Sequence, residues 1–175
     1  RMREFKSEKE WEGKTVAGFS VALKDAVTAD PNKFLENLNP LEEVGFIYVY
    51  KIIDGVKDAW KARKEFKWGK LFDFIDSYTE KDQFWKDELV VEKGEWLGGA
   101  DHEWVIGIIA ELIEEGTRDD SWVFSEDHFD KAKEIIFYLL REPKEDKEIT
   151  DYVTYTLNTP CGKLIGSLVN LTLRI

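Results

Sequence analysis

Cysteine is nearly absent from this sequence. Cys161 is the single cysteine among 175 residues, so no intramolecular disulfide framework and no zinc site built from several cysteines can form. This cysteine usage fits a reducing compartment, and we expect a cytoplasmic protein. No apolar run reaches the roughly 18 residues of a membrane span, and no apolar stretch of signal-peptide type follows the N-terminus. We therefore expect no membrane contact.

Basic residues are also scarce relative to acidic ones. The sequence has 25 Lys+Arg against 36 Asp+Glu, which gives a net charge of −11. Because phosphate contacts dominate affinity for DNA and RNA, an acidic chain is a poor candidate for a nucleic-acid binder. The 43% of apolar residues and 14% of aromatic residues disfavour intrinsic disorder. A folded domain with a protein partner is the remaining expectation.

Motifs of known catalytic chemistry are missing as well. The sequence has no GxxxxGK[ST] or GxGxxG phosphate-binding motif and no nucleophile elbow. The run Asp101-His102-Glu103 contains metal-ligating residue types, but consecutive residues of a helix point about 100° apart and do not share one ion readily. We assign no catalytic, cofactor-binding or metal-ligating residue and expect no cofactor.

What the sequence does contain is helical periodicity of apolar residues. This spacing predicts about seven helices: 15–28, a short one after Asp30-Pro31, 41–64, 67–79, 101–115, one after Ser125 and one after Thr159-Pro160. Residues 80–100 are predicted as a loop with one helical turn, and a short extended piece is the alternative for part of this stretch. The predicted fold class is all-α, as an irregular α-solenoid or a helical bundle, and no strict sequence repeat is visible.

Capping residues set the expected helix ends. Asp30 and Asp101 are typical N-caps, and Asn39 followed by Pro40 and Glu42 predicts the start of the helix at 41. This start signal is why we predict a helix for the β-prone run at 46–50. Ser125 is predicted to cap the helix that follows it, and Pro143 with the charged run 144–148 to end that helix. Gly116 is predicted at the C′ position of helix 101–115.

Charge is distributed unevenly along the chain. Residues 97–130 contain ten acids and one base, whereas residues 51–70 contain seven bases and three acids. Two solvated helix faces are one interpretation, and a surface that docks a partner or a neighbouring domain is the other. The second interpretation gives a possible partner surface made of Glu111, Glu114, Glu115, Asp119, Asp120 and Trp122.

Aromatic residues accompany the basic stretch. Trp60, Trp68, Phe72 and Tyr78 have helical spacing, so we expect core positions rather than a base-stacking surface. Trp122 lies in a predicted loop, where it is either an exposed anchor or the cover of a helix end. The glycines at 162 and 166 are four residues apart and predict close packing against a further helix.

The sequence begins without Met and ends at Leu173-Arg174-Ile175 within an apolar helical pattern. We therefore expect residues 1–175 to form one all-α segment of a longer polypeptide.

Two groups of residues carry a family resemblance. They are Asp30-Pro31 with Phe34-Leu35, 48–59 and Trp68 with Leu71, and the segment Leu157-Asn158-Thr159-Pro160-Cys161-Gly162-Lys163-Leu164-Ile165. Together they resemble the helical-repeat regions of large multidomain bacterial proteins such as signal-transducing P-loop NTPases of antiviral defence. In that family such regions act as the sensor of a foreign protein. The resemblance implies a recognition role and carries over no catalytic residue.

Three functional hypotheses follow. The first is a non-catalytic helical scaffold or recognition segment that binds another protein or a neighbouring domain. The second is a hydrolase or metal-dependent enzyme that uses the acidic segment 97–130, with Asp101, His102, Glu103 and His128 meeting in one cleft. The third is a stand-alone acidic adaptor that binds a basic partner through 111–130.

Overall fold

The structure, a computed structural model, describes residues 15–91, 99–141 and 159–174. Every regular element among these residues is a helix, so the predicted all-α fold is confirmed. The sequence-based statements about the N-terminal residues, about 92–98, about the helix stop at 143–148 and about 157–158 fall outside the described residues.

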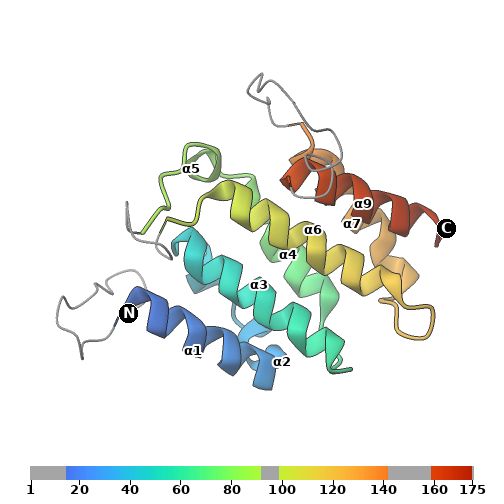
Figure 1. Cartoon of the computed structure of the whole chain (residues 1–175), viewed down its shortest axis with the longest axis horizontal. Coiled ribbons are helices and arrows are strands. Elements are labelled where there is room, and N and C mark those ends of the chain that lie inside the picture. Colours follow the sequence, from blue (N-terminus) through green and yellow to red (C-terminus); the bar gives the residue numbers. More distant parts are fainter. Residues whose placement is uncertain (1–14, 92–98, 142–158, 175) are drawn as a thin grey trace.

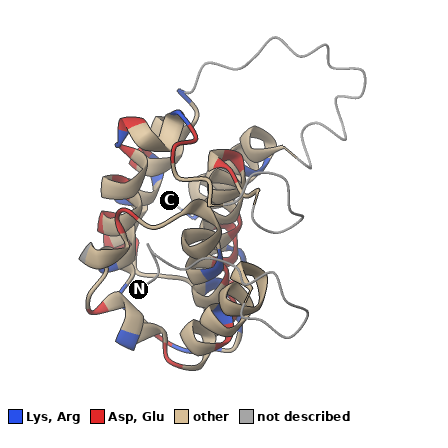
Figure 2. Cartoon of the chain, turned by 90° about the vertical axis from the view of Figure 1, so that its left-hand side faces the viewer, with Lys and Arg blue, Asp and Glu red and all other residues tan. Residues whose placement is uncertain are grey.

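The longer helices form two layers (Figure 1). The first layer contains α1 (Val16–Ala29), α3 (Phe46–Lys61), α6 (His102–Arg118) and α9 (Pro160–Thr172), which lie side by side. Behind them lie α4 (Trp68–Thr79) and α7 (Phe129–Leu139). The short helices α2 (Pro31–Leu35) and α5 (Asp82–Trp85) belong to the connections. Seen after a 90° turn, the helices stand in two stacks (Figure 2).

Neighbouring helices within a layer run parallel. Lys57 of α3 bonds to Glu111 of α6, and further along both helices Arg63 bonds to Asp119. Residue numbers therefore rise in the same direction along the two helices. The other neighbours are parallel too. The contacts Phe19–Tyr48 and Thr28–Gly55 show this for α1 and α3, and Glu111–Lys163 and Thr117–Arg174 show it for α6 and α9. For α4 and α7 the contacts are Asp76–Lys131 and Thr79–Tyr138.

The chain segments between parallel helices differ in length, which explains why no sequence repeat is visible. A return segment must lie between consecutive parallel helices, as in an α-solenoid: α2 with a 3₁₀ turn between α1 and α3, α4 with α5 between α3 and α6, and α7 between α6 and α9. The separation in sequence differs from pair to pair: 27 residues between Thr28 and Gly55, 54 between Lys57 and Glu111, and 57 between Thr117 and Arg174. The units therefore differ in length, and the solenoid is irregular.

Helix α3 occupies the centre of the first layer, between α1 and α6. The β-prone run 46–50 lies in this helix, and four of its side chains are almost fully buried, namely Phe46, Ile47, Tyr48 and Val49. A helix that is apolar around most of its circumference is stable when its neighbours cover it on several sides. Burial by the surrounding helices thus outweighs the local β propensity.

The predicted bounds of this helix were wrong. Asn39–Leu41 forms only a 3₁₀ turn, and the helix begins at Phe46 after the N-cap Gly45. The Phe46 N–H donates to the Leu89 carbonyl oxygen at 3.1 Å, so a distant loop supplies the acceptor that fixes the true start. At the other end Arg63 has a φ of 60°. Its left-handed backbone ends the helix at Lys61 rather than Lys64.

The other end signals have mixed outcomes. The Asp30 and Asp101 side chains each accept a backbone N–H at a helix start, as predicted, and Thr159 does the same at the predicted start of α9. Gly116 is not a C′ residue, because α6 continues to Arg118. The Ser125 side chain makes no capping bond, and a 3₁₀ turn at Glu126–His128 precedes α7. The loop after α4 contains one helical turn, α5, as predicted for its described part.

The aromatic residues beside the basic stretch are core residues, as predicted. Trp60, Trp68, Phe72 and Tyr78 are each at most 4% exposed. Trp68 packs edge-on against Trp60, with 5.0 Å between ring centroids, and in a tilted arrangement against Phe124, with 4.6 Å between centroids. A β-carbon at Gly116 would lie 2.6 Å from Phe124 Cδ1. Gly116 is therefore needed for close packing of this aromatic cluster inside α6.

Two helical glycines give a matched test of the packing. A β-carbon at Gly55 would lie 2.8 Å from the Lys24 carbonyl oxygen and 2.9 Å from Val27 Cβ, whereas Gly166 has no atom within 4 Å. We expect Gly55→Ala to lower the free energy of unfolding by about 1–3 kcal/mol through overpacking. Gly166→Ala should raise it by up to about 1 kcal/mol through helix propensity. Chemical denaturation measures both, and an equal effect of the two substitutions would contradict the close contact of α1 with α3.

Candidate functional site

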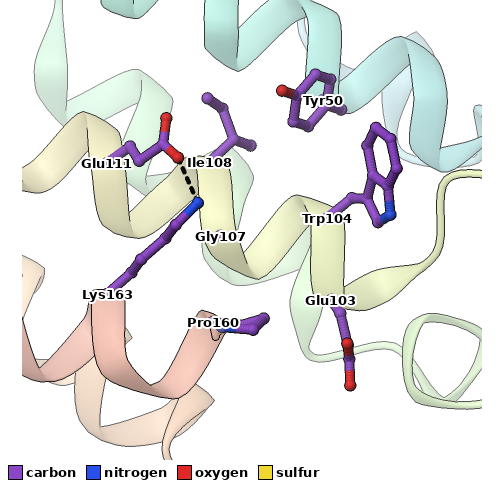
Figure 3. Close-up of a pocket in the computed structure, with 8 residues that line it drawn as sticks. All are labelled: Tyr50, Glu103, Trp104, Gly107, Ile108, Glu111, Pro160 and Lys163. Carbon is purple, nitrogen blue, oxygen red and sulfur yellow. Dashed lines mark hydrogen bonds and ion pairs between the residues drawn. The ribbon is translucent and has the colours of Figure 1, made fainter. Parts of the chain in front are cut away.

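A hollow of about 260 Å³ lies on the outer face of α6, between α3 and α9 (Figure 3). Its lining consists of Tyr50 from α3, Glu103, Trp104, Gly107, Ile108 and Glu111 from α6, and Pro160 and Lys163 from α9. The two flanking helices pack on opposite sides of α6 (Figure 1). Their separation leaves part of the α6 surface uncovered.

Gly107 has no side chain, so the middle of this surface is recessed. It lies one turn after Trp104 and one turn before Glu111 on the same face of α6. A β-carbon there would lie 3.8 Å from Lys163 Nζ, so a small side chain would only touch the lysine, but a large one would fill the hollow. The hollow is thus a consequence of one glycine between two large side chains.

An aromatic pair forms one wall of the hollow. The Tyr50 and Trp104 rings are 5.6 Å apart at an interplanar angle of 69°, an edge-to-face contact. Trp104 is 43% exposed, which is unusual for a side chain of this size. Burial and the carboxylates of Asp54 and Glu111 raise the pKa of Tyr50, so its hydroxyl remains protonated. The wall is therefore an uncharged aromatic surface in contact with solvent.

An alternating chain of charges crosses the first layer beside the hollow. Lys24 of α1 bonds to Asp54 of α3 at 2.7 Å, and Asp54 also contacts Lys57 at 3.3 Å. Lys57 reaches Glu111 of α6 at 2.6 Å. Glu111 in turn holds Lys163 of α9 at 2.5 Å, as Figure 3 shows. Five side chains thereby join four helices.

The pKa shifts follow from this pairing. Burial by itself would raise the pKa of Glu111, but hydrogen bonds from Lys163 and Lys57 outweigh it and hold the pKa below its ordinary value. Burial would lower the pKa of Lys57, but its bonds to Glu111 and Asp54 raise it. Glu111 and Lys57 therefore remain charged at neutral pH. Their role is electrostatic pairing, because neither a free base nor a free acid is left among them.

Most of the partner surface predicted from sequence is paired within the chain. Glu111 is held by two lysines, Glu115 contacts Lys61 and Arg118, Asp119 bonds to Arg63, and Asp120 bonds to Arg174. Three acids of the acidic stretch, at 111, 115 and 119, are therefore paired with three bases of the basic stretch, at 57, 61 and 63. Whether the same residues also contact another protein stays a prediction.

Trp122 covers a helix end, which is one of its two predicted roles. Its indole N–H donates to the Trp60 carbonyl oxygen at 3.1 Å, and the two indole rings are 4.6 Å apart. The Arg63 guanidinium lies 5.3 Å from the Trp122 ring centroid. The side chain is thus half-buried against the C-terminal end of α3.

The residues of the enzyme hypothesis do not meet. Asp101 caps α6, and His102 Nδ1 lies 2.8 Å from Asp87 Oδ1, beyond the C-terminal end of α4. His128 packs against Phe72, and its Cε1 lies 3.3 Å from where a Gly69 β-carbon would be, in the first turn of α4. A helix of 12 residues is about 18 Å long at about 1.5 Å per residue, so the two histidines lie near opposite ends of α4.

Metal-binding clusters and membrane-spanning helices are both absent from the part of the chain that the structure describes. Within it, no group of three or more His, Cys, Asp or Glu side chains is placed to hold a metal ion. None of the helices found there is both long and apolar enough to cross a membrane.

Sequence reasoning missed the hollow itself. Helical periodicity places Trp104 with the apolar residues of its helix, but it lies at the edge of that face, toward Gly107 and Glu111. A tryptophan next to a glycine on the polar side of a helix was the available signal. Tyr50 and Lys163 gave no signal, because only the parallel packing of α3, α6 and α9 brings them to the same place.

The charge chain can be tested at Glu111. We expect Glu111→Gln to lower the free energy of unfolding by about 1 kcal/mol or more, because two lysines lose their shared partner. Glu114→Gln is the matched control: Glu114 lies on the same helix, has no ion pair in the described structure, and should change stability by less than about 0.5 kcal/mol. Chemical denaturation at neutral pH measures both, and equal effects would contradict the role of the pairing.

The stability difference between the unmodified chain and Glu111→Gln should depend on pH. Because the folded-state pKa of Glu111 is lowered, its stabilising contribution is present above the unfolded value of about 4.3. It is lost as the pH falls through the lower folded-state pKa. The stability difference between the unmodified chain and Glu111→Gln should therefore shrink in acid, and a difference that stays constant from neutral pH to about pH 2 would contradict the assignment.

Comparisons with known proteins were made at the level of family, sequence and structure. No protein-family model, no curated protein and no solved structure matches this chain.

Proposed function

We propose that this chain is a non-catalytic helical recognition segment that binds another protein, or a neighbouring domain, through the hollow at Tyr50 and Trp104. The observation that carries the proposal is the exposure of Trp104. It is 43% exposed at the wall of a hollow, beside a second aromatic ring. Tryptophan and tyrosine at the centre of a recessed surface are the residues that contribute most to protein–protein affinity.

The size of the hollow supports a protein partner. Small-molecule and cofactor sites usually occupy about 300–1,000 Å³ and enclose most of the ligand. A volume of about 260 Å³ on an open helix face suits one or two side chains of a partner. The parallel first layer also offers a continuous surface on both sides of the hollow, as α-solenoids do when they bind proteins.

The sequence-based context fits within this proposal. The resemblance to sensor regions of antiviral P-loop NTPases would make the partner a foreign protein, and a cytoplasmic bacterial setting follows from the same resemblance. The acidic-adaptor hypothesis differs in placing the contact at 111–130, where most acids are paired within the chain. The hollow is the better-supported contact surface, because its tryptophan is uncovered.

Selection of binding peptides from a random displayed library tests the proposal. We expect peptides enriched on the unmodified chain to lose at least about tenfold in affinity on Trp104→Ala, a loss of about 1.4 kcal/mol that is typical of a contact at a hot spot. Phe137→Ala is the matched control, because Phe137 is an aromatic of α7 that is 49% exposed and lies outside the lining of the hollow. Thermal unfolding verifies that both variants fold.

Two results would count against the proposal. One is the absence of any enriched peptide. The other is an enriched set that binds Trp104→Ala as well as it binds the unmodified chain.

A further inference from the structure

We infer that the hollow receives a basic side chain, an arginine or lysine of the partner, whose aliphatic part crosses Trp104 and whose charged group is neutralised by Glu103. This inference rests on the proposed function and names the chemistry of the partner. It is carried by three observations: an acid left without an ion pair, an exposed aromatic surface and an existing example of the same contact within the chain.

The acid is Glu103. It lines the hollow, is exposed, and makes no ion pair with the described part of the chain. Two other acids of α6, Glu111 and Glu115, are paired with cations of neighbouring helices. Glu114, on the same outer face, has no ion pair within the described ranges either. The uncompensated charge along the outer face of α6 is therefore negative, and it favours a positively charged partner.

Lys163 does not cancel the negative charge of the hollow. Its ammonium group lies in the hollow but is held by Glu111 at 2.5 Å. The three charged residues of the lining, Glu103, Glu111 and Lys163, sum to one negative charge. An anionic partner would have to compete with Glu111 for the lysine and would meet Glu103 as well. A cationic partner meets an unpaired carboxylate.

The aromatic wall complements a cation. The faces of tryptophan and tyrosine rings carry negative electrostatic potential and attract ammonium and guanidinium groups within about 6 Å. Lys51 Nζ already lies 5.2 Å from the centroid of the Tyr50 ring. Trp104, the more exposed ring, has no such cation in the described structure. Long basic side chains also bury their aliphatic stems on apolar surface while the charged end stays in water.

The chain contains the proposed contact once already. The Arg63 guanidinium lies 5.3 Å from the Trp122 ring centroid and also bonds to the Asp119 carboxylate. A tryptophan face and an adjacent acid thus hold one basic side chain at the C-terminal end of α6. Trp104 and Glu103, which point to different sides of α6 (Figure 3), offer the same two kinds of group near its N-terminal end.

A titration with defined peptides tests the inference on the full chain. The probe is an acetylated peptide of alternating glycine and arginine, and the matched peptide replaces every arginine by citrulline, which has the same shape without the charge. Binding is followed by the NMR shift of the Trp104 indole N–H, assigned with Trp104→Phe. We expect the arginine peptide to move this signal saturably, with at least about fivefold higher affinity than the citrulline peptide and lower affinity at higher salt.

A comparison of two variants tests whether Glu103 is the acid that attracts the arginine peptide. Glu103→Gln should weaken the arginine peptide by about threefold or more, whereas Glu126→Gln should leave its affinity unchanged. Glu126 is an exposed acid of the 3₁₀ turn before α7 and does not line the hollow. Amide spectra verify that both variants remain folded.

The outcomes separate this inference from the proposed function. Equal binding of the citrulline peptide, no shift of the Trp104 signal, or equal effects of Glu103→Gln and Glu126→Gln would each overturn the basic partner. The proposed function would still stand if library-selected peptides depend on Trp104. If one of these results is found and the selected peptides also bind Trp104→Ala as well as the unmodified chain, both the basic partner and the proposed function are wrong.

Discussion

The pairing of charges on α3 is the constraint on which the rest of this structure depends. This helix lies at the centre of the first layer, and Asp54, on its polar stripe, is only 8% exposed. A charge removed from water is costly unless another charge compensates it. Lys24 from α1 and Lys57 from α3 itself supply that compensation, and Lys57 extends the pairing to Glu111 of α6. The neighbours of α3 are therefore fixed in register as well as in position.

This pairing gives the net charge of −11 a different meaning. Parts of the basic stretch at 51–70 and of the acidic stretch at 97–130 lie along the adjacent parallel helices α3 and α6, where three bases pair with three acids. The acids that stay unpaired on the outer face of α6 then have more influence on a partner than the total does, since paired charges contribute little field at a distance. Glu103 is the unpaired acid that coincides with an exposed tryptophan.

The helices were predictable from sequence wherever the signal was local. Asp30, Asp101 and Thr159 cap helices because their side chains reach a backbone N–H three residues ahead. Predictions failed where a distant residue supplied the missing partner. Leu89 bonds to the Phe46 N–H and so moves the start of α3, and Phe124 with Trp68 packs on Gly116 and keeps it within α6.

The sequence by itself determined an all-α chain, most of its helices, its aromatic core and the presence of two oppositely charged stretches, because periodicity, capping and composition act over a few residues. Only the tertiary structure decided which charges cancel and which surface stays open. The parallel order of α3, α6 and α9 brings Tyr50, Trp104 and Lys163 together across more than one hundred residues of sequence. No local pattern encodes that meeting, because it depends on which helices share a layer.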